Sequence, residues 1–139
     1  MNHLLSETAL WITESEFVYP DGSISKGKGK SNIDVKEIIV INNSRTMFGE
    51  NEISHDYVIR YISDNEYSFE SVNPELGTMK GVFNIDRNLV FSKFAVQDTA
   101  LNGFEIIRRE AETCFAHGAL YDGHTLINTW NAVMKKVLG

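Results

Sequence analysis

The chain has 139 residues, of which 42% are hydrophobic and 23% charged, so we expect one globular domain spanning residues 1–139. The formal net charge of −6 argues against nucleic acid and anionic membranes as partners, because both require a basic surface. The start, MNHLLSETALW, lacks the basic region and the long apolar run of a secretory signal. No apolar run reaches the roughly 18 residues of a membrane helix, and Cys114 is the single cysteine. We therefore expect a cytoplasmic protein.

The first predicted strand covers residues 8–19, where aromatic and polar residues alternate with carboxylates. One face carries Trp11, Thr13, Ser15, Phe17 and Tyr19, and the other carries Glu14 and Glu16. Because carboxylates belong in water, we expect the face with Trp11 and Phe17 to point inward.

The next segment, DGSISKGKGKS, is similar to a phosphate-binding loop but misses the required pattern by one residue in either frame. Gly29 follows Gly27-Lys28 where Ser or Thr is needed, and Ile24 occupies the first glycine position of the other frame. Asp21-Gly22 instead predicts a hairpin turn, followed by a strand over residues 23–35. We expect its alternating lysines to face water and its glycines to lie where a bulky neighbour approaches.

Turn residues and β-rich runs then recur at short intervals along the chain. The remaining predicted strands cover residues 37–47, 53–63, 66–72, 78–85, 89–96, 104–111, 113–120 and 125–137. This spacing predicts an all-β, antiparallel up-and-down meander of about eight to ten strands. Closure into a barrel is favoured, because an open sheet would leave two exposed edges.

The last segment, residues 125–137, fits both a helix and a strand. Its apolar residues follow helical spacing, but the Asp122-Gly123 turn before it favours a hairpin with residues 113–120. We predict a strand that also pairs with residues 8–19 and places Trp130 beside Trp11 or its neighbours. A helix packed outside the barrel is the alternative.

The succession of short strands and tight hairpins, with an early tryptophan in ETALWITESEF, resembles the calycin superfamily. This superfamily includes the lipocalins, the fatty-acid-binding proteins and the nitrobindin-like haem proteins. The resemblance is architectural and covers the whole chain. Ala9 stands where lipocalins carry a glycine two residues before the tryptophan, and no helix pair fits between Tyr19 and Ser23. The resemblance implies a lipocalin-like barrel with an internal cavity for a small, largely apolar molecule.

We therefore predict a binding protein that holds a small hydrophobic or amphipathic ligand, with no cofactor and no metal. The predicted ligand contacts are Trp11, Phe17, His55, Tyr57, Tyr61, Phe69, Phe83, Arg108 and Trp130. The alternative is that these aromatic side chains fill the barrel as a packed core. A homodimer remains an open alternative to the monomer.

An enzyme is the second class of function, as a cofactor-free isomerase, cyclase or decarboxylase inside the same barrel. His55, Tyr57, Tyr61, Arg108 and Glu110 would supply acid–base groups and an anion anchor if they converge. Arg108 and Glu110 share a face with Phe104 and Ile106, and an exposed, charged strand end is the other interpretation of that face.

The remaining histidines give weaker predictions. We expect His3 to be terminal and disordered and His124 to lie in a solvated turn. His117 lies in a strand, and the nitrobindin resemblance would suggest it as a haem ligand if it faces the cavity. Strand alternation places Cys114 and His117 on opposite faces, which argues against a nucleophilic pair.

Overall fold

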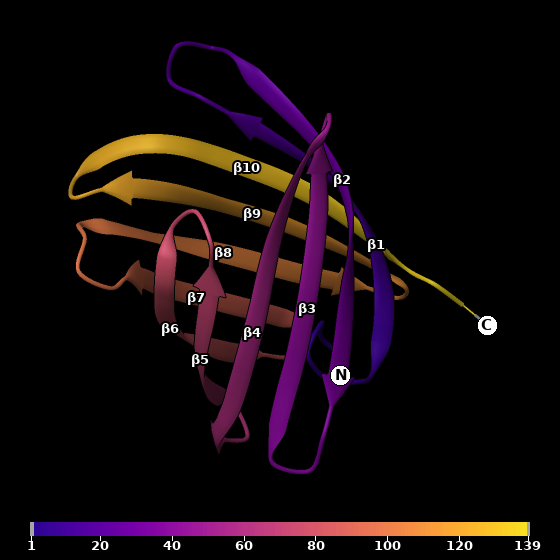
Figure 1. Ribbon diagram of the computed structural model, residues 1–139. Helices are drawn as coiled ribbons and strands as arrows, with labels where there is room; N and C mark the ends of the chain where they lie inside the picture. Colours follow the sequence, from indigo (N-terminus) through magenta and orange to yellow (C-terminus); the bar gives the residue numbers. More distant parts are fainter. Residues whose placement is uncertain (1, 139) are drawn as a thin grey trace.

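The computed structural model describes residues 2–138 and consists of ten β-strands arranged as a closed barrel (Figure 1). The strands are β1 (Ala9–Val18), β2 (Ile24–Val35), β3 (Ile39–Phe48), β4 (Asn51–Ser63), β5 (Glu66–Asn73), β6 (Gly77–Asp86), β7 (Leu89–Val96), β8 (Leu101–Glu110), β9 (Thr113–Asp122) and β10 (Thr125–Lys136). Each pairs antiparallel with its sequence neighbours, and β1 pairs with β10 to close the barrel. The predicted antiparallel up-and-down barrel is confirmed.

The hairpin between β1 and β2 follows from its turn residues. Gly22 has a φ of 88°, a left-handed conformation that suits glycine, and the Ser23 amide donates a 2.8 Å hydrogen bond to Asp21 Oδ1. Along β2 the lysines are exposed and the glycines face inward. A Cβ on Gly27 would come within 2.7 Å of the Phe48 ring, so this glycine leaves room for that ring. The lysine–glycine segment is therefore a strand and not a phosphate loop.

The C-terminal segment is the closing strand. β10 pairs with β9 on one side and with β1 on the other, from Trp11 opposite Lys136 to Val18 opposite Thr129. The Trp130 ring stacks on Phe17 with 5.8 Å between the centroids. Both the predicted strand and the position of Trp130 beside the Trp11 face of β1 are confirmed.

The residues before β1 cover one end of the barrel, which we call the closed end. His3, Leu4 and Leu5 are 7%, 4% and 2% exposed, and the leucines belong to the core. The Leu5 amide donates to His3 Nδ1, and the Ser6 hydroxyl donates to the His3 carbonyl. The expectation that His3 is disordered is wrong, because two adjacent leucines bury the turn that contains it. In Figure 1 the N-terminus lies at the same end as the β2–β3 connection.

The closed end is filled by a packed core. Trp11, Ile33, Val40, Ile59, Val90 and Cys114 are all 0% exposed. Phe69 and Phe83 stack beside them, with ring centroids 4.3 Å apart. This half of the barrel leaves no room for a ligand, so the interior near the other end is the part that could hold one.

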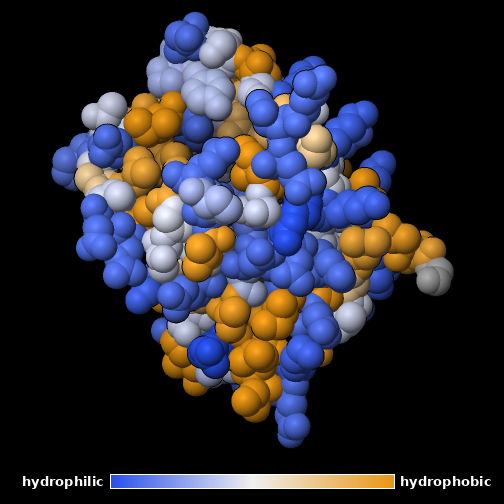
Figure 2. Space-filling model, in the orientation of Figure 1, coloured by the Kyte–Doolittle hydropathy of each residue, from blue (hydrophilic) through white to orange (hydrophobic). Residues whose placement is uncertain are grey.

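The outer surface is mostly hydrophilic, with apolar side chains between the polar ones, as Figure 2 shows for one face. The most exposed large apolar side chains are Ile38, Leu138 and Val72, at 73%, 70% and 60%. In Figure 2 apolar side chains gather near the lower end of this face, and exposed apolar side chains are common on protein surfaces. No helix in the described part of the chain is long and apolar enough to cross a membrane.

Candidate functional site

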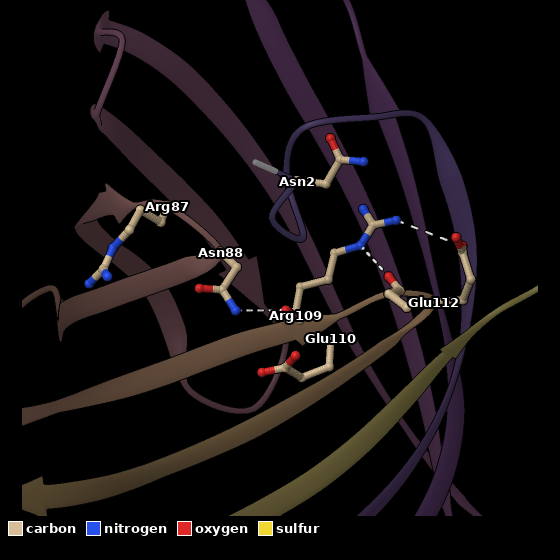
Figure 3. Close-up of a pocket in the computed structure, with 7 residues that line it drawn as sticks. Asn2, Arg87, Asn88, Arg109, Glu110 and Glu112 are labelled. Atoms are coloured by element: carbon tan, nitrogen blue, oxygen red, sulfur yellow. Dashed lines mark hydrogen bonds and ion pairs between the residues drawn. The ribbon is translucent and has the colours of Figure 1, made fainter.

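Among the surface recesses of the described residues, two hold polar side chains. The larger holds about 450 Å³ at the closed end and is lined by Asn2, Arg87, Asn88, Arg109, Glu110, Ala111 and Glu112. Figure 3 shows the Arg109 side chain reaching across it toward Glu112, while Arg87 points away. The smaller recess holds about 390 Å³ beside Tyr61 and Tyr67.

The polar groups of the larger recess already bind one another. The Arg109 guanidinium, 3% exposed, donates to Glu7 Oε1 at 2.7 Å, to the His3 carbonyl at 3.2 Å and to the Ala111 carbonyl at 2.8 Å. It also lies 5.1 Å from the centre of the Trp11 ring. Hydrogen bonds from Lys136 and then Arg109 lower the pKa of Glu7. This cluster is a structural clamp that holds the N-terminal segment on the barrel.

The interior toward the other end differs from the packed core. Several of its inward-facing side chains are only half-buried, although they lie inside a closed barrel, whereas Ser71, Asn73, Met79 and Val96 on β5 to β7 are buried. The half-buried side chains are Ser15, Phe17, Asn42, Ser44, Thr46, Phe48, His55, Tyr57, Phe94, Glu105, Trp130 and Ala132. We call this set the accessible interior. It combines aromatic rings with a few polar groups, which is the composition of a small-molecule site.

Glu105 and Trp130 form the central polar contact of the accessible interior. Both residues lie directly opposite Gly118 of β9, one on β8 and the other on β10. A Cβ on Gly118 would collide with the indole, so the glycine lets the ring lie across β9. The indole Nε1 then donates a 2.6 Å hydrogen bond to Glu105 Oε2.

The Glu105 carboxyl lacks the partners that a buried acid normally has. Burial raises its pKa, and the hydrogen bond from Trp130 opposes this only in part. Among the described residues, Glu105 takes part in no ion pair, and its Oε1 accepts no hydrogen bond. A carboxyl in such surroundings costs stability unless a ligand or water meets it.

Across the interior, Asn42, Tyr57 and Ser71 stand in one row on β3, β4 and β5. Asn42 Oδ1 and Ser71 Oγ are buried without a hydrogen-bond partner in the described structure. Burial raises the pKa of Tyr57, and the charge of Glu105 raises it further. Buried polar atoms without partners are rare in proteins and mark places where water or a ligand binds.

His55 lies beside this row with its ring stacked on Tyr57 at 6.1 Å. The Asn73 amide nitrogen is 3.2 Å from His55 Nε2. Burial lowers the pKa of His55, which favours the neutral imidazole. In the described part of the chain, no three His, Cys, Asp or Glu side chains gather as a metal site.

The predicted ligand contacts fall into three groups. Phe17, His55, Tyr57 and Trp130 belong to the accessible interior. The second group, Trp11, Phe69 and Phe83, lies in the packed core. Tyr61 is 36% exposed near the closed end, where it packs edge-on against Tyr67, and Arg108 is outside the barrel.

The predicted contact from Arg108 requires an inward side chain, but β8 turns its other face inward, and the exposed, charged strand end is confirmed instead. Arg108 is about half exposed, pairs with Glu110 at 3.3 Å and lies over the Phe115 ring. The inward residues of β8 are Gly103, Glu105, Ile107 and Arg109. Both faces of this strand carry charge, so hydrophobic alternation does not distinguish them. Gly103 is the signal that could have done so, since glycines on other strands also face inward beneath aromatic rings.

The five residues of the enzyme alternative do not converge. Arg108 and Glu110 are on the outer surface, whereas His55 and Tyr57 are inside. His117 is exposed on the outer face of β9, so it does not reach the interior. Cys114 faces inward, away from His117, and burial raises the pKa of its thiol to about 12. The predicted opposite faces of Cys114 and His117 are confirmed.

Comparison with known proteins identifies the architecture. No protein-family model matches the chain, and no curated protein matches it. Among solved structures, the chain is similar to the crystal structure of Rv2717c from M. tuberculosis, with a TM-score of 0.76 and 10% identity. The match covers 94% of this chain and 92% of that one. At this identity the likeness shows the fold alone, a closed barrel over nearly the full length.

Proposed function

We propose that the protein is a calycin-like binding protein that holds a small hydrophobic or amphipathic molecule in the accessible interior. The observation that carries this proposal is the contrast between two groups of side chains that face into the same barrel. At the closed end Trp11 and Ile59 are fully buried, whereas Phe17, Tyr57 and Trp130 keep accessible surface while facing inward. In a barrel that only packed its core, the second group would be buried like the first.

The aromatic rings of the accessible interior would bind the apolar part of such a ligand. Phe17 stacks on Trp130 at 5.8 Å and meets Phe48 edge-on at 5.4 Å. Rings held in this way offer rigid apolar area at little entropic cost. The net charge of −6 also favours a small molecule over nucleic acid or an anionic membrane as the partner, and a cytoplasmic setting remains part of the proposal.

Tryptophan fluorescence tests the proposal, because only one of the two tryptophans reaches the accessible interior. Trp11 is fully buried in the core and Trp130 is half-buried. Fatty acids, retinoids, haem and long-chain alcohols should be screened for quenching. We expect at least one class to quench Trp130, and Trp130→Phe to remove the signal while calorimetry still detects binding.

A filling substitution provides the control. Ser15 faces the accessible interior between the small residues Gly27 and Ala132, so Ser15→Phe should occupy the space and abolish binding. Glu14→Phe places the same ring on the outer face of β1 and should bind as the wild type does. If no ligand class binds the wild type, the interior is packed and the proposal fails.

A further inference from the structure

We propose that the ligand carries a protonated amine head group, which binds Glu105, and an apolar chain, which lies along Phe17 and Trp130. This inference rests on the proposed function and names the chemistry of the ligand. It excludes simple fatty acids as the preferred ligands of this barrel.

The charges that face the interior support an amine rather than a carboxylate. Arg109 and Lys136 are the only lysine or arginine side chains among residues 2–138 that are not exposed. Both lie at the closed end, where each pairs with Glu7 and Glu112. No free basic side chain of the described residues therefore meets a ligand carboxylate in the accessible interior. A buried carboxylate without a cation would be strongly disfavoured.

Glu105 supplies a negative charge in the accessible interior. One of its oxygens accepts from Trp130, while Oε1 has no donor among the described residues. An ammonium group has three donors and no acceptor, so it matches this free carboxylate oxygen. The Trp130 indole donates to the carboxyl and Phe17 stacks on that indole, so aromatic surface for the apolar chain lies next to the site of the head group.

The burial of Glu105 makes amine binding depend on pH. Its pKa is raised because burial disfavours the charged form. A bound ammonium would supply the missing opposite charge, so the carboxyl would ionise and release its proton. Amine affinity should therefore rise with pH through the folded-state pKa of Glu105. The facing titratable groups are Tyr57, which stays protonated, and His55, which burial keeps neutral.

The experiment compares three ligands with one chain and different head groups. Dodecylamine, dodecanol and dodecanoate, each below its micelle concentration, should be titrated by calorimetry into the wild type, Glu105→Gln and Glu110→Gln. The wild type should bind the amine about tenfold or more tightly than the alcohol, because the amine adds a charge-assisted hydrogen bond to Glu105. Glu105→Gln should remove this preference and still bind the alcohol. Glu110→Gln changes an exposed carboxyl on the same strand and should behave as the wild type.

The outcomes separate the two proposals. If none of the three ligands binds, the proposed function and this inference both fail. If the alcohol binds but the amine binds no more tightly, or if dodecanoate binds most tightly, the proposed function stands and the amine inference is overturned. The amine inference is also overturned if Glu105→Gln keeps the full preference for the amine.

Discussion

The indole of Trp130 on β10 and the carboxyl of Glu105 on β8 meet across Gly118 of β9 through a hydrogen bond of 2.6 Å. This contact joins two residues that no local pattern relates, and it places a carboxyl beside aromatic rings inside the barrel. An apolar residue at position 105 would pack there at lower cost. Under the proposed function, this carboxyl serves ligand binding rather than stability.

Replacing the acid should make the ligand-free protein more stable at neutral pH. Because burial raises the folded-state pKa of Glu105, the folded state holds this proton more tightly than the unfolded state. Its contribution to stability is therefore present at acid pH and is lost as pH rises through the folded pKa. Glu105→Gln cannot ionise, so its melting temperature should exceed that of the wild type at about pH 7, with the difference shrinking toward about pH 4. An equal difference at both pH values would contradict this explanation.

The clamp at the closed end should dominate the stability of the N-terminal segment. Arg109→Ala removes a buried guanidinium that binds Glu7 and the His3 carbonyl, and it should cost about 3–5 kcal/mol in the free energy of unfolding. Arg108→Ala, on the outer face of the same strand, should cost less than about 1 kcal/mol. Urea unfolding of both variants measures the two costs, and similar values would argue against the clamp.

The same clamp should weaken in mild acid through His3. Burial, followed by smaller charge effects that include Arg109, lowers the pKa of His3 from 6.5 to about 4, and its Nδ1 accepts the Leu5 amide in the neutral form. The unfolded state therefore binds the proton more readily, so this contribution is complete above the unfolded pKa and is lost as pH falls toward about 4. Between about pH 7.5 and pH 5 the loss should be about 2 kcal/mol.

His3→Gln provides the comparison for that pH dependence. Glutamine does not titrate, so urea unfolding of the variant should lose less stability than the wild type over the same interval. The pKa of Glu7 is lowered, so its contribution to stability changes mainly below this pH interval. The effects of Glu7 and His3 can therefore be separated. Identical pH profiles for the two proteins would show that His3 does not carry the effect.

The closing strand gives the last stability prediction. Trp130→Ala removes a half-buried aromatic side chain that packs on Phe17, and it should cost about 3 kcal/mol in urea unfolding. Deleting everything after His124 removes β10 and opens two strand edges, on β1 and β9. The shortened chain should show no cooperative unfolding transition. A stable, cooperative truncated barrel would contradict the role assigned to β10.

The fold could be predicted because its determinants are local. Asp21-Gly22 and Asp122-Gly123 specify hairpins, and the alternation in β1 orients Trp11 and Phe17. The site could be predicted only in part, because it depends on which face of each strand points inward. In β8 two adjacent arginines place charge on both faces, and Arg109 is buried only because the N-terminal segment covers it with Glu7 and a carbonyl. That segment has no periodicity that predicts its position.

The most direct test of binding inside the barrel is to locate a bound ligand by NMR. The backbone amides should be assigned, and the ligand that binds most tightly should be titrated into the wild type. We predict the largest chemical-shift changes at Phe17, Tyr57, Glu105 and the Trp130 indole, with little change at Arg87 and Asn88. Changes concentrated at Arg87, Asn88 and Arg109 would place the ligand in the recess at the closed end and would contradict binding inside the barrel.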